Sequence, residues 1–163
     1  MKHAYLIASL VVVYLPGAGA VEFNTDALKA MQEEGHKIVE ESKALRAYKL
    51  PTGKCLYVAG DVTKPGANLV IQNCNPKLNN QKWRFDGAGR LVNQGGKCVG
   101  VAGDPNKPGA NVLIQNCAAA KAQQWKQDDK KRLVNGLNKC LHAAGDAKTP
   151  GGNVVTINCN ASP

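Results

Sequence analysis

The hydrophobic positions of the chain fall into three patterns, and each predicts a different structure. The first is an almost wholly apolar run over residues 6–15, which follows the basic Lys2 and precedes the small residues 18–20. This arrangement is typical of an export signal, and the run is too short to span a bilayer. We therefore expect residues 1–20 to be a signal peptide and the mature chain to begin at Val21.

The second pattern lies in residues 21–46, where apolar or small residues recur at alternating spacings of three and four. They are Leu28, Met31, Gly35, Ile38, Ser42 and Leu45. This spacing predicts one face of an amphipathic helix, and Asn24, Thr25 and Asp26 are suitable N-cap residues. The apolar face would pack on its own domain or join a second copy in a coiled coil.

The third pattern is a repeat of roughly forty residues that fills the rest of the chain. Each copy carries an apolar segment at a first cysteine, a turn rich in Gly, Pro and Asn, and a second apolar segment that ends at a second cysteine. The first cysteines fall 43 and then 42 residues apart, and 19 positions separate the two cysteines of every copy. Short strands spaced by such turns predict an all-β barrel or sandwich.

The equal spacing favours disulfides within each copy, namely Cys55–Cys74, Cys98–Cys117 and Cys140–Cys159. Export would place these cysteines in an oxidising compartment, where disulfides persist. A zinc site is disfavoured because the sequence has no CxxC pair and only two histidines after the signal. We expect neither a metal nor a cofactor.

The charge of +9 is unevenly distributed. Residues 47–163 hold sixteen bases and six acids, whereas residues 21–46 hold four bases and six acids. A basic surface either favours anionic partners, such as acidic glycans, or serves only as a solvated face. The lysines are scattered singly apart from residues 130–132, without the interleaved aromatic residues that base stacking needs, so no specific nucleic acid partner is expected.

A second motif recurs in register with the cysteines, as Gln81-Lys82-Trp83 and Gln123-Gln124-Trp125. Together with the Gly-x-Asn turns, it makes residues 46–163 resemble the ricin B-type lectin family. The resemblance implies a β-trefoil of three repeats, at about 47–88, 89–130 and 131–163, preceded by the amphipathic α-helix. It also implies carbohydrate binding, often of galactose or N-acetylgalactosamine.

Sugar-binding repeats of that family place Asp two residues after the first cysteine and an aromatic residue two before the second. Here the first position holds Tyr57, Gly100 and His142, and the second holds Gln72, Gln115 and Ile157. The family also places Asn beside the Gln of Gln-x-Trp, and only Asn80-Gln81 matches that element. No copy holds the full galactose set, so the resemblance does not extend to galactose specificity.

Other polar residues agree among the three copies. The copies share Asp61, Asp104 and Asp146, and Asn68, Asn111 and Asn153; Lys64 and Lys107 also agree, with Lys148 one place earlier relative to its aspartate. They form either a modified sugar pocket, in which the lysines add a preference for anionic sugars, or ordinary turn chemistry. The candidate carbohydrate contacts are Tyr57, Asp61, Asn68, Gln72, Asn80, Gln81, Asp104, Asn111, Gln115, Asp146 and Asn153.

The third copy has only four residues after Cys159 and lacks a Gln-x-Trp strand. Three explanations stay open: the segment around 21–23 or the helix fills the place, a second subunit fills it, or the gene is a shortened copy. We expect the first, because the helix has an apolar face to bury. An oligomer or a protein partner bound through the helix is the second expectation.

These patterns predict a secreted or extracytoplasmic lectin-like protein, periplasmic location included, that binds a glycan and does not catalyse. The alternative is a protein-interaction or toxin-targeting module on a β-trefoil that has lost sugar binding. An enzyme is not expected, because the sequence offers no recognisable catalytic carboxylate pair or Ser-His-Asp set, and no free thiol if all cysteines pair.

Overall fold

The structure is a computed structural model that describes residues 24–161, so the expected signal peptide lies outside the described residues. The described chain divides into two units between residues 38 and 39. Among the described residues, no helix is both long and apolar enough to cross a membrane.

Helix α1 (Thr25–Lys43) confirms the helix predicted from the apolar spacing. Asn24 caps it, since its side-chain Oδ1 accepts a hydrogen bond from the backbone N–H of Ala27 at 3.0 Å. Leu28 and Met31 on its apolar face are 52% and 58% exposed. What covers this face remains a prediction.

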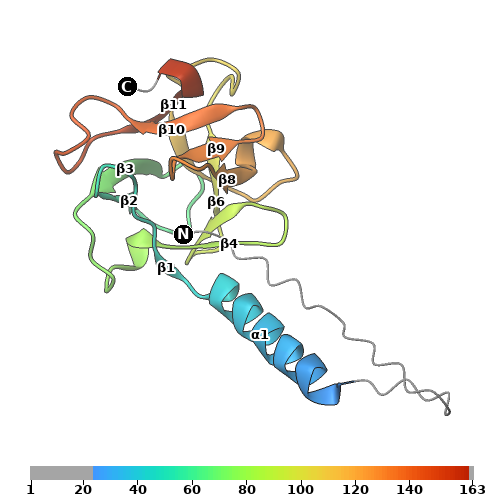
Figure 1. The fold of residues 1–163 in the computed structure, drawn as a ribbon. Coiled ribbons are helices and arrows are strands. Elements are labelled where there is room, and N and C mark those ends of the chain that lie inside the picture. The colour runs from blue at the N-terminus through green and yellow to red at the C-terminus, as the bar shows by residue number, and fades with distance from the viewer. Residues whose placement is uncertain (1–23, 162–163) are drawn as a thin grey trace, which may run out of the picture. The chain divides into compact units, whose positions relative to one another are not determined.

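Each repeat begins with a short entry strand and continues into a hairpin (Figure 1). A disulfide joins the two strands of each hairpin near their ends. The entry strands are β1 (Arg46–Ala47), β5 (Leu91–Asn93) and β9 (Leu133–Asn135). The hairpins pair β2 (Cys55–Ala59) with β3 (Asn68–Gln72), β6 (Cys98–Val101) with β7 (Val112–Gln115), and β10 (Lys139–Ala143) with β11 (Val154–Asn158).

Repeats 1 and 2 add a 3₁₀ turn and a further strand that carries the tryptophan. These are η1 (Asn79–Gln81) with β4 (Lys82–Phe85), and η2 (Lys121–Gln123) with β8 (Trp125–Gln127). In repeat 3 the described chain closes with the 3₁₀ turn η3 (Cys159–Ala161). The strands β1, β4 and β5 are successive antiparallel neighbours, and β8 pairs with β9 in the same way.

Backbone hydrogen bonds join the three hairpins into a closed ring. The turn of each repeat accepts a bond from the second strand of another repeat: Ile114 N–H to Ala67, Thr156 N–H to Ala110, and Ile71 N–H to Gly152. The third of these bonds returns to repeat 1, so the arrangement has threefold pseudosymmetry. This confirms the expected β-trefoil.

One hydrophobic core serves all three repeats. Strand alternation sends Leu56 and Val58 inward, where both are fully buried, and their counterparts in the other hairpins also belong to the buried core. Trp83 and Trp125 are 1% and 3% exposed, which confirms them as the largest core elements. The expected disulfides are confirmed, with Cα atoms 5.0 Å apart in each of Cys55–Cys74, Cys98–Cys117 and Cys140–Cys159.

Candidate functional site

The outer face of the β2–β3 hairpin gathers two of the predicted contacts. Leu56 and Val58 point to the core, so the alternate residues of β2 and β3 face outward. Tyr57 is opposite Val70 and is diagonal to Gln72, and all three are half-buried. Diagonal neighbours on one face are within reach of a long side chain.

Asn80 closes one end of this face. Its Nδ2 donates to the carbonyl oxygens of Val58 at 2.8 Å and of Gly60 at 2.9 Å. Both amide hydrogens are therefore used, and the Oδ1 atom stays available as an acceptor. Repeat 1 therefore carries an aromatic ring and an amide on this face, and a side-chain carbonyl on the residue that bonds to Val58 and Gly60.

The neighbouring Gln81 has a different role, because it is fully buried. Its Oε1 accepts from the backbone N–H of Asn75 and its Nε2 donates to the carbonyl of Asn73, both at 2.7 Å. The side chain thus ties the Gln-x-Trp strand to the segment around the second cysteine. Its predicted contact with sugar remains untested, although its amide is already bonded.

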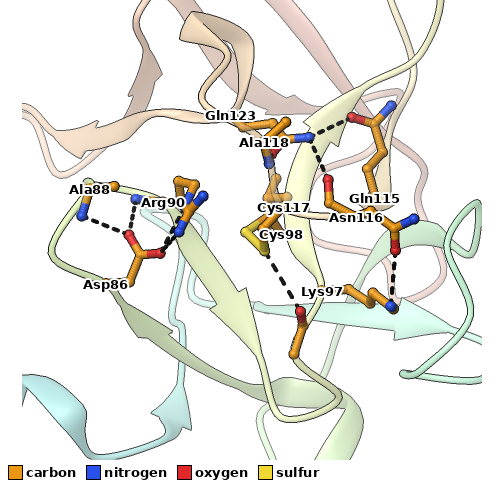
Figure 2. The surroundings of a disulfide bond; sticks show 12 residues. Asp86, Ala88, Arg90, Lys97, Cys98, Gln115, Asn116, Cys117, Ala118 and Gln123 are labelled. Carbon is orange, nitrogen blue, oxygen red and sulfur yellow. Dashed lines mark hydrogen bonds and ion pairs between the residues drawn. A yellow bond between two sulfur atoms is a disulfide. The ribbon is translucent and has the colours of Figure 1, made fainter.

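In repeat 2 the side chain of Gln115 covers part of the equivalent face. The Gln115 side chain lies against Gly100 so closely that a Cβ there would collide with its Oε1 atom. Its Nε2 donates to the Val101 carbonyl at 3.3 Å, and its Oε1 accepts from Gln123 at 3.1 Å, as Figure 2 shows for the latter pair. Gln115 is thereby held by neighbours on both sides.

In repeat 3 the same face carries His142, Val155 and Ile157. His142 and Ile157 are half-buried, and the described chain has no Gln-x-Trp strand beside them. The three outer faces therefore differ in chemistry although their backbones match.

The three turn asparagines are brought together in a ring at the centre of the pseudosymmetry. Asn68 donates to Asn153, Asn153 donates to Asn111, and Asn111 donates to Asn68, at 2.7, 2.9 and 2.8 Å. Each side chain gives one bond and receives one, and all three are partly buried. This cyclic network joins the repeats, a role that sequence reasoning did not foresee.

The three turn aspartates are exposed and bond to their own turns. Asp61, Asp104 and Asp146 accept from the backbone N–H two residues later, at 2.8, 3.0 and 2.9 Å. The backbone bond from Thr63, and then its hydroxyl, lower the pKa of Asp61. Lys64 is 3.9 Å from the Asp61 carboxylate. The turn interpretation accounts for these bonds, and a sugar role stays a prediction.

Another repeated contact was missed at the sequence level. The lysine before each first cysteine bonds to the asparagine before each second one: Lys54 to Asn73, Lys97 to Asn116, and Lys139 to Asn158. Distances from Nζ to Oδ1 are 2.7, 3.0 and 2.6 Å. The threefold recurrence of Lys-Cys and Asn-Cys was the available signal.

Comparison with known proteins accounts for these features together. The sequence profile described as "Ricin-type beta-trefoil lectin domain" matches residues 42–163. The chain belongs to this family. No curated protein sequence matches the chain closely enough to count as a relative.

Solved structures share the fold of this ricin-type domain. A designed threefold-symmetric protein, ThreeFoil, has 28% identity and a TM-score of 0.60, over 72% of this chain and 91% of that one. The hemolytic lectin CEL-III has 30% identity and a TM-score of 0.57, over 71% of this chain but only 27% of its own length. The β-trefoil lectin of the Vibrio vulnificus hemolysin, at 23% identity, has a TM-score of 0.58, over 72% of this chain and 86% of that one.

Metal chemistry has no evident location in the part of the ricin-type domain that the structure describes. Among the side chains that the structure describes, those of residues 24–36 and 44–160, no three from His, Cys, Asp or Glu lie close enough together to hold an ion. The outer faces offer instead hydrogen-bonding amides, a tyrosine ring and a histidine.

Proposed function

We propose that this ricin-type lectin domain is a secreted, non-catalytic carbohydrate-binding protein whose principal sugar contacts lie in repeat 1. The observation that carries the proposal is the outer face of β2–β3, where Tyr57 is diagonal to Gln72 and the Asn80 side chain bonds to the carbonyl of the adjoining Val58. Repeat 1 is the one described repeat that combines an aromatic ring with amide groups on this face.

The chemistry of this face suits a sugar ring. Tyr57 supplies a flat apolar surface with a polar edge, which can pack against the C–H face of a sugar. The Oδ1 atom of Asn80 accepts from a hydroxyl, and the amide of Gln72 makes no bond to any described residue. A few convergent polar groups around an apolar surface are what small-ligand sites generally use.

The choice of probe follows from the related structures. The Vibrio vulnificus β-trefoil lectin was solved with N-acetyl-D-lactosamine, and a Momordica charantia homologue of type II ribosome-inactivating proteins with α-methyl-D-galactoside. Both are below 25% identity, so they support the fold, and their sugars serve here as first probes. Sulfated and carboxylated glycans are the second set, because residues 47–163 are strongly basic.

Export is supported by the apolar run at the N-terminus and by the three disulfides. N-terminal sequencing of the protein recovered from its native source should begin at Val21. A sequence that begins at Met1 would contradict the proposed signal peptide.

A second candidate function is a protein-interaction module without sugar binding. The observation that favours it is Gln115, which fills the outer face of repeat 2 and is bonded on both sides. If repeat 1 is equally closed to sugars, the domain retains only its fold.

A glycan array on the disulfide-bonded protein tests the proposal. We expect binding to at least one galactose-containing or anionic glycan, and a loss of roughly tenfold in affinity, about 1.4 kcal/mol, in Tyr57→Ala. The matched control is His142→Ala, at the same position of repeat 3, which should bind as the unaltered protein does. Absence of binding to every glycan at micromolar protein would favour the second candidate.

A further inference from the structure

One glutamine occupies the same position on the outer faces of repeats 1 and 2. Gln72 is opposite Cys55 and Gln115 is opposite Cys98, in the same register of the two hairpins. The Nε2 atom of Gln115 donates to the Val101 carbonyl at 3.3 Å, whereas the Gln72 amide makes no bond to any described residue. The same residue type is thus folded back against the hairpin in repeat 2 and has unused amide groups in repeat 1.

The residue diagonal to the glutamine determines whether there is room for this folded-back conformation. In repeat 2 it is Gly100, where a Cβ atom would collide with the Gln115 Oε1 atom. The backbone of Gly100 does not itself require glycine, because its φ lies outside the left-handed region. In repeat 1 the diagonal residue is Tyr57, whose Cβ atom takes the corresponding place. Gln72 therefore cannot adopt the conformation of Gln115 while Tyr57 is present.

The carbonyl that receives the folded-back amide is already bonded in repeat 1. Val58 is the counterpart of Val101, and its carbonyl accepts from the Asn80 Nδ2 atom at 2.8 Å. The counterpart of Asn80 in repeat 2 is Ala122, which has no side-chain donor. A carbonyl oxygen can accept two hydrogen bonds, so Asn80 acts together with Tyr57 and not alone.

The glutamines of the two Gln-x-Trp segments differ in the same sense. The Nε2 atom of Gln123 donates to the Asn116 carbonyl and to the Gln115 Oε1 atom, each at 3.1 Å (Figure 2). Among the described residues, the Nε2 atom of Gln81 donates only to the Asn73 carbonyl, at 2.7 Å. The side-chain amides of repeat 2 therefore form a continuous chain of hydrogen bonds, which in repeat 1 is interrupted at the outer-face glutamine.

We propose that Tyr57 and Asn80 are positioning residues that prevent Gln72 from folding back and so keep the outer face of repeat 1 open. Tyr57 excludes the folded-back side chain from its space, and Asn80 occupies the carbonyl to which it would bond. The residue types at these two positions thus determine which repeat presents a glutamine amide to a ligand. The inference deepens the proposed function and rests on it in one respect, namely that Gln72 contacts the sugar.

The first test needs no sugar and follows the side-chain amide of Gln72 by NMR in the isotopically labelled chain. Hydrogen bonding slows the exchange of amide protons with water. In the double variant Tyr57→Gly/Asn80→Ala, we expect this exchange to slow several-fold and a contact between the amides of Gln72 and Gln81 to appear. Tyr57→Ala is the matched control, because it retains the Cβ atom and Asn80, and the exchange should stay fast. Unchanged exchange in the double variant, or equal slowing in the control, would overturn the proposal.

The converse change in repeat 2 decides the proposal even if the double variant does not fold. Gly100→Ala adds one Cβ atom in the space of the Gln115 Oε1 atom, so Gln115 should swing outward and exchange its amide protons several-fold faster. Gly87→Ala is the matched control, because a Cβ atom there meets no described neighbour, and the exchange of Gln115 should not change. An amide of Gln115 that stays protected in Gly100→Ala would contradict the proposal.

A transplant then connects the position of the glutamine to sugar binding. The double variant Gly100→Tyr/Ala122→Asn reproduces in repeat 2 the residue pair of repeat 1. Titration calorimetry with the best glycan from the array should find two glycans bound per chain, where the unaltered chain binds one. A single bound glycan in the variant would show that this pair does not determine which repeat binds. An unaltered chain that binds no glycan would refute the proposed function, while the amide exchange rates would still decide whether Tyr57 and Asn80 position Gln72.

Discussion

Repeats 1 and 3 have matching backbones, but they differ in whether side chains donate hydrogen bonds to the outward carbonyls of the first hairpin strand. In repeat 1, side chains of the Gln-x-Trp segment cover two outward carbonyls of β2, since Trp83 donates to Leu56 and Asn80 donates to Val58. In repeat 3, no described side chain donates to the equivalent carbonyls of Leu141 and Ala143. The difference therefore lies in the segment that follows the hairpin, and the hairpin itself is preserved.

The same comparison separates residues that build the trefoil from residues that differ among repeats. Disulfides, the Lys–Asn bonds and the asparagine ring recur in every repeat and are structural. Pro51, by contrast, differs from its counterparts in repeats 2 and 3. The backbone N–H groups of Gln94 and Gly136 donate hydrogen bonds to the Gln-x-Trp segments, whereas a proline has no backbone N–H to donate. A proline is one common means of protecting a strand edge.

The largest predicted effect on stability comes from the Gln-x-Trp strand, which repeats 1 and 2 each possess. Trp83→Ala should cost about 3–5 kcal/mol in the free energy of unfolding, because it opens a cavity in the core and leaves the Leu56 carbonyl unbonded. Urea denaturation measures this cost. Tyr57→Ala, on the outer face, is the control and should cost less than about 1 kcal/mol. A similar small cost for Trp83→Ala would contradict the role of this strand.

The asparagine ring should show the next effect. Asn68→Ala leaves the Asn111 amide without its acceptor and Asn153 without its donor, at a cost of about 1–3 kcal/mol. Adding Asn111→Ala should then cost less than it does alone, because the ring is already open. Additive losses in urea denaturation of the double variant would show that the three side chains act separately. Exposed Asn106→Ala serves as the control.

Acid should destabilise the β4–β5 and β8–β9 hairpins, which lead into repeats 2 and 3. Partial burial alone would raise the pKa of Asp86, but the hydrogen bonds from Arg90 have the larger effect, so the pKa of Asp86 is lowered. The pKa of Asp128 is lowered in the same way by the hydrogen bonds from Arg132. A lowered pKa in the folded state means that this stabilisation is present above the unfolded-state value of about 3.9 and is lost as the pH falls through the folded value.

Unfolding free energies at pH 7 and pH 3 provide the measurement. Asp86→Asn and Asp128→Asn should each reduce the difference between the two pH values, while the exposed Asp129→Asn should not. An undiminished pH dependence in both variants would show that other groups cause the acid sensitivity.

The smallest predicted effect on stability concerns one position in the turns of the β4–β5 and β8–β9 hairpins, where the residue type differs. Lys131 has φ 60°, in the left-handed region, where the equivalent Gly89 has φ 74°. Lys131→Gly should therefore raise stability by up to about 1 kcal/mol, and Gly89→Lys should lower it by a similar amount. Thermal unfolding of the two variants checks the pair, and a loss in Lys131→Gly would mean that the lysine side chain makes a stabilising contact.

Much of the fold was predictable because it repeats along the chain. Equal cysteine spacing indicated the three disulfides, and Gln-x-Trp in register with them indicated the trefoil. The roles of individual polar side chains were not predictable, because they depend on contacts between repeats. The asparagine ring joins Asn68 to Asn153, 85 positions away, and only the threefold arrangement brings them together. Sequence comparison of the repeats likewise could not show that Gln115 folds back over Gly100.

The central claim, that sugar is bound on the outer face of repeat 1, is tested most directly by NMR titration of the isotopically labelled chain with the best glycan from the array. The account predicts chemical-shift changes concentrated at Tyr57, Gln72 and Asn80, with His142 and Gln115 unaffected. Changes centred on the outer face of repeat 2 or repeat 3, with repeat 1 silent, would contradict it.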